Sequence, residues 1–135
     1  MFVLDASVAL AWCLDDETSE FADRILAQLD LDDAIVPAIW PLEVANGLRT
    51  AERRGRVDVT GLSRVHALLL SLPVRVEAVL LGDAFGSVTD VARRSDISVY
   101  DASYLVLAAR RHLRLATMDD RLRQACLQTN VELVL

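Results

Sequence analysis

The sequence contains no lysine, so all 14 of its basic residues are arginines. Because no side chain carries a primary amine, catalysis through a Schiff base is excluded. A phosphate-binding loop of the GxxxxGK[ST] type is excluded as well, since its lysine is needed to reach the phosphates. Phosphotransfer domains of the receiver and haloacid-dehalogenase kinds also rely on a lysine, and the sequence disfavours both.

Glycine, proline and aromatic residues are also scarce. The chain has 5 glycines and 3 prolines among its 135 residues, and no run of either marks a linker between domains. Only 5% of the residues are aromatic, whereas 53% are hydrophobic. We therefore expect a single domain over residues 1–135, with a core built mainly from leucine, valine, alanine and isoleucine.

The charge balance is acidic, with a formal net charge of −6. Such a chain is a poor general binder of polyanions. A role with nucleic acid would therefore need local clusters of arginine and a bound cation that offsets the acids.

The two cysteines, Cys13 and Cys126, are far apart and form no CxxC pair, which favours buried, reduced thiols. Asp5 interrupts the apolar start of the chain, which argues against a secretory signal. No charge-free apolar run approaches the roughly 18 residues of a transmembrane span. We therefore expect a cytoplasmic protein that has no membrane partner.

Apolar strand-like runs alternate with helical patterns along the whole chain. This order is typical of an α/β fold in three layers, with helices on both faces of a central, mainly parallel sheet of about five strands. The strand-like runs are 2–4, 34–39, 74–79, 98–100, 115–118 and 131–135; of these, 74–79 alternates with charge and is expected near a sheet edge, and 98–100 is a short strand or the approach to one. The helical patterns are 8–14, 18–31, 41–54, 58–72 (or from 60), 83–94 (or from 87), 101–113 and 120–127.

Four acids occupy similar places in this pattern: Asp5, Glu43, Asp101 and Asp119 each lie where a strand-like run ends or a helix begins. In an open parallel α/β sheet the strand ends converge on one crevice, where such folds bind ligands. Carboxylates that share a crevice repel one another unless a cation lies between them, and all-oxygen sites suit Mg²⁺ or Mn²⁺. The four acids therefore predict a metal site, with Asp5, Asp101 and Asp119 as the expected ligands.

Each acid also has a structural alternative. Asp101 and Asp119 are placed to cap the helices that follow them, and Glu43 is placed to interact with the positive end of its helix. Asp5 has the weakest alternative, because Ser7 is the better-placed cap for the first helix. The joint pattern of four acids is more than capping requires.

Three polar residues are candidates to support the acids. Asn46 lies three residues after Glu43 and so shares its helix face, and the hydroxyls of Ser7 and Thr117 are able to donate to a carboxylate or to water. The alternative for Asn46 is an ordinary polar surface residue. For Ser7 it is a helix cap, and for Thr117 it is a residue at a strand end.

At these places the sequence resembles the motifs of PIN domains, particularly those of the VapC-type toxins of bacterial toxin–antitoxin pairs. The similar segments are VLDAS at 3–7, EVANGL at 43–48, VYDASYLVLA at 99–108 and ATMDDRL at 116–122, in the family's order and at its usual spacings. Carried over residue by residue, the family's acids fall on Asp5, Glu43, Asp101 and Asp119, and the positions that usually support them fall on Ser7, Asn46 and Thr117.

The resemblance implies a PIN-like three-layer fold and a Mg²⁺- or Mn²⁺-dependent endoribonuclease. It also implies a cognate, VapB-like antitoxin that holds the enzyme inactive, with its C-terminal segment over the acidic groove and often a basic side chain in it. Members of the family typically form homodimers, so a homodimer is expected here.

Arginine must supply any contacts to phosphate. Arg49 and Arg53, near the end of the helix that carries Glu43, are the candidate RNA contacts; the alternative is a solvated helix face with pairs to residues such as Glu52. A metal-activated water needs no 2′-hydroxyl, so the acids by themselves do not select RNA over DNA. The alternatives are therefore a DNA-directed nuclease with the same metal site and a non-catalytic PIN-like module that binds protein or RNA.

Overall fold

Four strands form the central sheet of the computed structural model, which describes residues 1–17 and 19–135. Thr18, expected as the first residue of the second helix, lies outside the described residues. The strands are β1 (Phe2–Leu4), β2 (Ala34–Pro37), β3 (Val74–Glu77) and β4 (Leu115–Ala116), in the order β3-β2-β1-β4. All three neighbouring pairs are parallel, so the expected α/β fold with a parallel sheet is confirmed.

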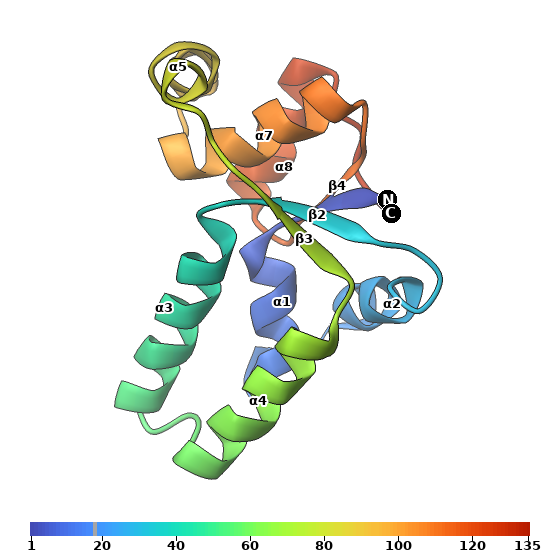
Figure 1. The fold of residues 1–135 in the computed structure, drawn as a ribbon, viewed down its shortest axis with the longest axis vertical. Coiled ribbons are helices and arrows are strands. Elements are labelled where there is room, and N and C mark those ends of the chain that lie inside the picture. Colours follow the sequence, from blue (N-terminus) through green and yellow to red (C-terminus); the bar gives the residue numbers. More distant parts are fainter. Residues whose placement is uncertain (18) are drawn as a thin grey trace.

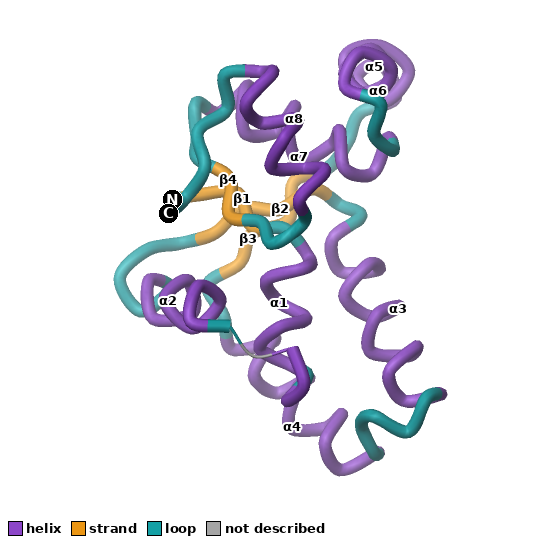
Figure 2. Tube along the Cα trace, turned by 180° about the vertical axis from the view of Figure 1, so that it is seen from behind, coloured by secondary structure: helices purple, strands orange, loops and turns teal. Residues whose placement is uncertain are grey.

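The helices cover both faces of the sheet and give three layers (Figure 1, Figure 2). One face carries α1 (Ala6–Cys13), α2 (Glu20–Gln28), α3 (Trp40–Arg53) and α4 (Val59–Ser71). The other face carries α5 (Leu81–Asp83), α6 (Thr89–Ser95), α7 (Val99–Arg111) and α8 (Asp120–Thr129). A 3₁₀ turn at Asp15–Glu17 follows α1, and a π-helical turn at Ala84–Val88 joins α5 to α6.

The strand expected at 131–135 is only partly formed. Leu133 makes a single parallel bridge with Leu115. The Leu115 amide donates to the Glu132 carbonyl at 2.8 Å, and the Val134 amide donates to the Leu115 carbonyl at 2.9 Å. Because β4 is only two residues long, it has no room for a longer ladder, and the sheet has four strands in the described chain instead of about five.

Several helix starts differ from the sequence prediction. The run 98–100 is not a strand, because Ser98 caps α7 and its hydroxyl accepts a hydrogen bond from the Asp101 amide at 3.0 Å. A short apolar run fits a strand and a buried helix equally well, and here the serine cap decides for the helix. Helical structure also begins at Leu81, earlier than the predicted start at Asp83 or Ser87.

Other helix ends follow their local sequence signals. Pro41 lies in the first turn of α3, and Gly55, just past its end, has a φ of 72°, a left-handed conformation that glycine adopts without strain. Asp58 caps α4, accepting a hydrogen bond from the Gly61 amide at 2.7 Å. Pro41 and Gly55 thus define the two ends of α3, which carries Glu43.

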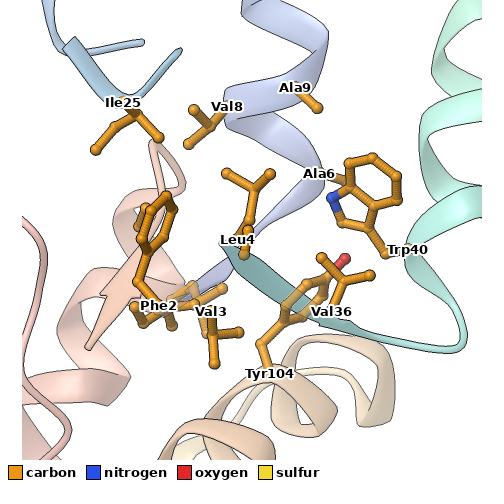
Figure 3. Packing of buried hydrophobic residues seen from close by; sticks show 14 of the residues in the cluster. Phe2, Val3, Leu4, Ala6, Val8, Ala9, Ile25, Val36, Trp40 and Tyr104 are labelled. Carbon is orange, nitrogen blue, oxygen red and sulfur yellow. The ribbon is translucent and has the colours of Figure 1, made fainter. Parts of the chain in front are cut away.

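The core surrounds β1, one of the two inner strands of the sheet. Figure 3 shows its side chains between α1, which carries Val8 and Ala9, and α7, which carries Tyr104. Phe2, Val3 and Leu4 are all fully buried, as expected for a parallel strand with helices over both faces. The end of β1 is therefore held rigidly, and the next residue along the chain is Asp5.

Both cysteines are free and buried, as their spacing predicted. Burial raises the pKa of Cys13 and of Cys126 to about 11, so both thiols keep their proton at neutral pH. Among the described helices, none is both long enough and apolar enough to cross a membrane.

Candidate functional site

Asp5 begins the candidate site at the carboxyl end of β1. Its backbone amide donates to the Ala116 carbonyl at 3.0 Å, which extends the pairing of β1 with β4 by one residue. Its side chain is only 5% exposed. Within the described chain it forms no ion pair, so an acidic side chain is buried without a basic partner.

Two hydroxyl groups, and no basic side chain of the described chain, donate hydrogen bonds to the Asp5 carboxylate. Ser7 Oγ donates to Asp5 Oδ2 at 2.5 Å, and Thr117 Oγ1 donates to the same oxygen at 2.7 Å. Burial raises the pKa of Asp5 above its usual range, and the two hydroxyls and the Ser7 and Ala6 amides only partly oppose this rise. Ser7 and Thr117, predicted as supporting residues, thus contact Asp5 directly.

The expectation that Ser7 caps the first helix is wrong. The N-cap of α1 is Asp5, which makes no side-chain capping bond. Ser7 lies two residues later, where its Oγ accepts from the Met118 amide at 3.0 Å while it donates to Asp5. Its hydroxyl therefore ties α1 to the segment after β4 and is not available to the helix end.

Glu43 lies in the first turn of α3 and is half-buried. Its Oε1 accepts a hydrogen bond of 2.6 Å from the hydroxyl of Tyr104 on α7. Burial raises the pKa of Glu43, the Tyr104 hydrogen bond opposes the rise, and the charges of Asp5 and Asp101 add to it. Glu43 is thus within electrostatic reach of two of the other predicted acids.

Sequence reasoning missed Tyr104. It is fully buried, and burial together with the bond to Glu43 raises the pKa of its phenol, so the hydroxyl keeps its proton at neutral pH. The signal that could have found it was its spacing: Tyr104 lies three residues after Asp101, and residues with this separation share a helix face.

Asp101 lies in the first turn of α7 and does not cap it, because Ser98 does. The capping alternative for Asp101 is therefore wrong. Its carboxylate is half-buried, and its pKa is raised by burial first and then by the charges of Asp119 and Asp5, while Ser98 and Arg121 lower it. Asp101 is thus within the electrostatic influence of Asp5, which follows β1, and of Asp119, which follows β4.

Asp119 is the N-cap of α8, so the capping alternative holds for this acid. Its Oδ1 accepts from the Leu122 amide at 2.9 Å, and its own amide donates to Thr117 Oγ1 at 3.0 Å. The side chain is exposed. Capping engages Oδ1 and fixes the direction of the carboxylate. Oδ2 takes no part in the cap and can bind a cation.

The donor set suits a hard divalent cation, since it consists of carboxylate oxygens around a buried acid. Within residues 1–17 and 19–135, no three histidine, cysteine, aspartate or glutamate side chains stand close enough together to enclose one ion. Mg²⁺ does not require such an enclosure, because it dehydrates reluctantly and keeps several of its waters when it is bound. The buried, unpaired Asp5 is the observation that fits a cation.

The remaining predicted residues lie on α3, beyond Glu43. Asn46 is exposed and makes no side-chain hydrogen bond within the described chain. Arg49 pairs with Glu52 at 3.2 Å, as the solvated-face alternative anticipated, and Arg53 is exposed in the last turn. The structure thus places Ser7 and Thr117 against Asp5 and leaves each of the four acids within electrostatic reach of at least one other. Asn46, Arg49 and Arg53 are surface residues of α3.

Comparison with known proteins connects this geometry to a family. The family model described as "PIN domain" matches residues 2–127. The chain belongs to the PIN-domain family. The resemblance to this family is therefore confirmed, and the matched range contains all four acids.

Named relatives of this PIN domain are VapC proteins. The chain is 33% identical over 126 residues to "Ribonuclease VapC3" of Pyrobaculum aerophilum, an alignment that covers 90% of this chain and 92% of the relative. It is 34% identical over 122 residues to "Ribonuclease VapC9" of Mycobacterium tuberculosis, covering 90% and 88%. These matches confirm the VapC type of the PIN domain.

Solved structures show the same fold. The protein PAE2754 from Pyrobaculum aerophilum has a TM-score of 0.69 at 26% identity and is matched over 92% of this chain and 83% of its own. FitAcB from Neisseria gonorrhoeae has a TM-score of 0.67 at 18% identity, covering 100% and 97%. A "toxin-antitoxin complex from Klebsiella pneumoniae" has a TM-score of 0.61 at 15% identity, covering 88% and 87%.

Proposed function

We propose that this PIN domain is a divalent-metal-dependent endoribonuclease that acts as the toxin of a toxin–antitoxin pair. The observation that carries the proposal is the environment of Asp5: a buried acid with hydroxyl donors but no basic partner in the described chain, next to β4 and within the influence of Glu43 and Asp101. An uncompensated buried carboxylate is costly, and a cation in the crevice would remove that cost.

In the proposed mechanism the acids divide two tasks. Asp5, Asp101 and Asp119 would hold Mg²⁺ or Mn²⁺. When bound, the ion would supply the positive charge that activates water and stabilises the negative charge of the phosphodiester in the transition state. Glu43, with Oε1 held by Tyr104, would orient the attacking water through Oε2 and accept its proton. Ser7 and Thr117 keep the Asp5 carboxylate in place by donating to Oδ2.

The choice of RNA rests on the relatives. Both VapC proteins compared above are named ribonucleases, whereas the acids alone do not select the sugar, because a water nucleophile makes no use of a 2′-hydroxyl. Arg49 and Arg53 are the proposed phosphate contacts. With RNA as substrate, the cytoplasm is the proposed place of action.

The proposed partners follow from the same family. A solved structure with this fold is named as a toxin–antitoxin complex. The corresponding proposal here is a cognate VapB-like antitoxin that covers the four acids. The proposed assembled form of this chain is a homodimer. In this proposal the antitoxin places a basic side chain against the four acids and packs an apolar surface beside them.

Cleavage of a mixed RNA pool by the purified protein tests the enzyme. We expect cleavage with Mg²⁺ or Mn²⁺, loss of cleavage in EDTA, and loss in Asp5→Asn, while Asp30→Asn, a change to an exposed acid outside the site, leaves it intact. Cleavage that survives EDTA or Asp5→Asn would reject the metal site. Single-stranded DNA in the same assay tests the DNA-directed alternative.

Expression in a bacterial host tests the toxin role. We expect growth arrest with the wild-type chain and normal growth with Asp101→Asn at equal protein level. Arrest by the Asp101→Asn variant would show that catalysis is not the cause, and would favour the non-catalytic binding module instead.

A further inference from the structure

Tyr104 and Glu43 join the two layers of helices across the end of the sheet. Tyr104 belongs to α7 on one face and Glu43 to α3 on the other (Figure 1). They are 61 positions apart in sequence, and the phenol donates to Glu43 Oε1 at 2.6 Å. In the described chain Glu43 accepts the hydrogen of the Tyr104 hydroxyl, and the Ala6 amide is a second polar neighbour of that hydroxyl.

The hydrogen bond opposes a repulsion. Glu43 is half-buried and carries a flexible side chain, and the charges of Asp5 and Asp101 both act on it. Like charges drive such a side chain away from the crevice, towards water, unless a donor holds it. Tyr104 is a donor without charge that is itself immobilised in the core, where its ring packs against the residues of β1 and β2 (Figure 3).

We propose that Tyr104 is a positioning residue for the reaction: it holds Glu43 Oε1 and thereby turns Oε2 towards Asp5 and Asp101. The inference rests on the proposed nuclease function and adds a residue to it. Tyr104 touches neither substrate nor cation in this arrangement and acts through Glu43 alone. A charge-assisted hydrogen bond from a buried phenol is strong enough to select one orientation of the carboxylate.

The ring and the hydroxyl of Tyr104 have separable roles. The ring fills the core between α7 and the sheet, as a phenylalanine ring would, and the hydroxyl alone reaches Glu43. Tyr104→Phe therefore keeps the packing and removes the donor. Tyr100→Phe is the matched control, because Tyr100 lies one turn earlier on α7 with its side chain exposed.

Two measurements test the variant. We expect Tyr104→Phe to lower the rate of RNA cleavage in saturating Mn²⁺ by about tenfold, because a misplaced catalytic group costs rate without loss of the chemistry. We also expect its Mn²⁺ affinity, measured by titration calorimetry without RNA, to fall severalfold. Tyr100→Phe should match the wild type in both.

A double-mutant cycle separates positioning from general structural damage. If Tyr104 acts through Glu43, then Tyr104→Phe changes the Mn²⁺ affinity of the wild type but not that of Glu43→Ala. An equal change in both backgrounds, or no change in either, would overturn the proposal. If instead the wild type binds no Mn²⁺ and cuts no RNA, the proposed function fails first, which is a different result.

A crystal structure of the wild-type protein grown with Mn²⁺ serves if Tyr104→Phe does not fold. The expected structure has the Tyr104 hydroxyl on Oε1 and has Oε2 facing the ion or one of its waters. A hydroxyl turned away from Glu43, or Oε1 facing the ion, would overturn the proposal without any variant.

Discussion

The hydroxyl of Thr117 donates to Asp5 Oδ2 at 2.7 Å, although the two residues are 112 positions apart in the sequence. Thr117 is 1% exposed and Asp5 is 5% exposed, so the bond is buried. It connects the end of β1 to the segment after β4, where the same hydroxyl accepts a hydrogen bond from the Asp119 amide.

Removal of this donor should destabilise the protein. In Thr117→Val the Asp5 carboxylate keeps its burial but loses one of its two hydroxyl donors, and leaving a buried charged group short of a partner costs about 1–3 kcal/mol. Urea denaturation without metal measures the loss of unfolding free energy. Thr60→Val, an exposed position in α4, is the control, and equal stability of the two variants would contradict the expected role of Thr117.

The stability of the metal-free protein should fall as pH rises above the acidic range. The pKa values of Asp5, Glu43 and Asp101 are all raised, in each case by burial first. In the unfolded chain these groups ionise near their ordinary values of 3.8 and 4.5, so above those values the folded state binds more protons. The stabilisation is therefore complete below the unfolded pKa values and is lost as pH rises through the folded ones.

Comparison with Asp5→Asn isolates the contribution of that acid. The melting temperature in EDTA, followed from about pH 4 to pH 8, should decline less steeply in Asp5→Asn than in the wild type, and the variant should be the more stable protein at neutral pH. Parallel curves would show that Asp5 is ionised with little penalty in the folded state.

A divalent cation should reverse the penalty. Mn²⁺ or Mg²⁺ that binds only the folded state adds about 2.7 kcal/mol at a concentration 100 times its dissociation constant. Thermal melts with and without metal should show this rise for the wild type and for Asp30→Asn, and a much smaller one for Asp101→Asn. An equal rise in Asp101→Asn would place the cation elsewhere.

The arginines of α3 should contribute to RNA binding through charge. In an Asp5→Asn background, which leaves RNA intact, Arg53→Glu should weaken affinity. It should also reduce the slope of log affinity against log salt by about 0.7 for each phosphate of single-stranded RNA that is no longer neutralised. Arg75→Glu, on the edge strand β3, is the control. Filter binding over a salt series that shows identical slopes would discard Arg49 and Arg53 as the contact surface.

Close packing of α1 on α3 should matter for the position of Glu43. A Cβ atom at Gly47, one turn after Glu43, would lie 2.6 Å from Cδ1 of Leu10 in α1. Gly47→Val should therefore cost about 1–3 kcal/mol through overpacking and lower RNA cleavage by moving α3 away from Asp5. Gly82→Val, at a position where an added Cβ atom meets nothing within 4 Å, should change neither the denaturation midpoint nor the cleavage rate.

Strands and helix ends were predicted correctly where the local sequence pattern fits only one structure. The apolar run at 2–4 and the charge-alternating run at 74–79 were correctly predicted as a strand and as a strand near the sheet edge, because burial on two faces or on one gives different patterns. The predicted ends of the helical patterns 41–54 and 58–72 lie beside Gly55 and at Asp58, and each of these residues satisfies a geometric need of the backbone.

Prediction failed where the deciding partner is distant in sequence. Ser7 has the right chemistry for a helix cap, and only the fold shows that it is used by Asp5 and Met118 instead. Tyr104 was missed, because Glu43, the acceptor of its hydroxyl, lies on another helix. The apolar run before Asp101 was ambiguous over so short a length, and the Ser98 cap resolves it as helix.

The pairing of β1 with β4 also decides when during synthesis the acids meet. Phe2–Leu4 are synthesised long before β4, and Val3 and Leu4 gain their second neighbours only when Leu115 and Ala116 have followed. A nascent chain that stops short of this point carries Asp5 without Thr117 and without Asp119. The proposed nuclease is therefore inert until these residues have been made, and the ribosome that produces it is not exposed to its activity before then.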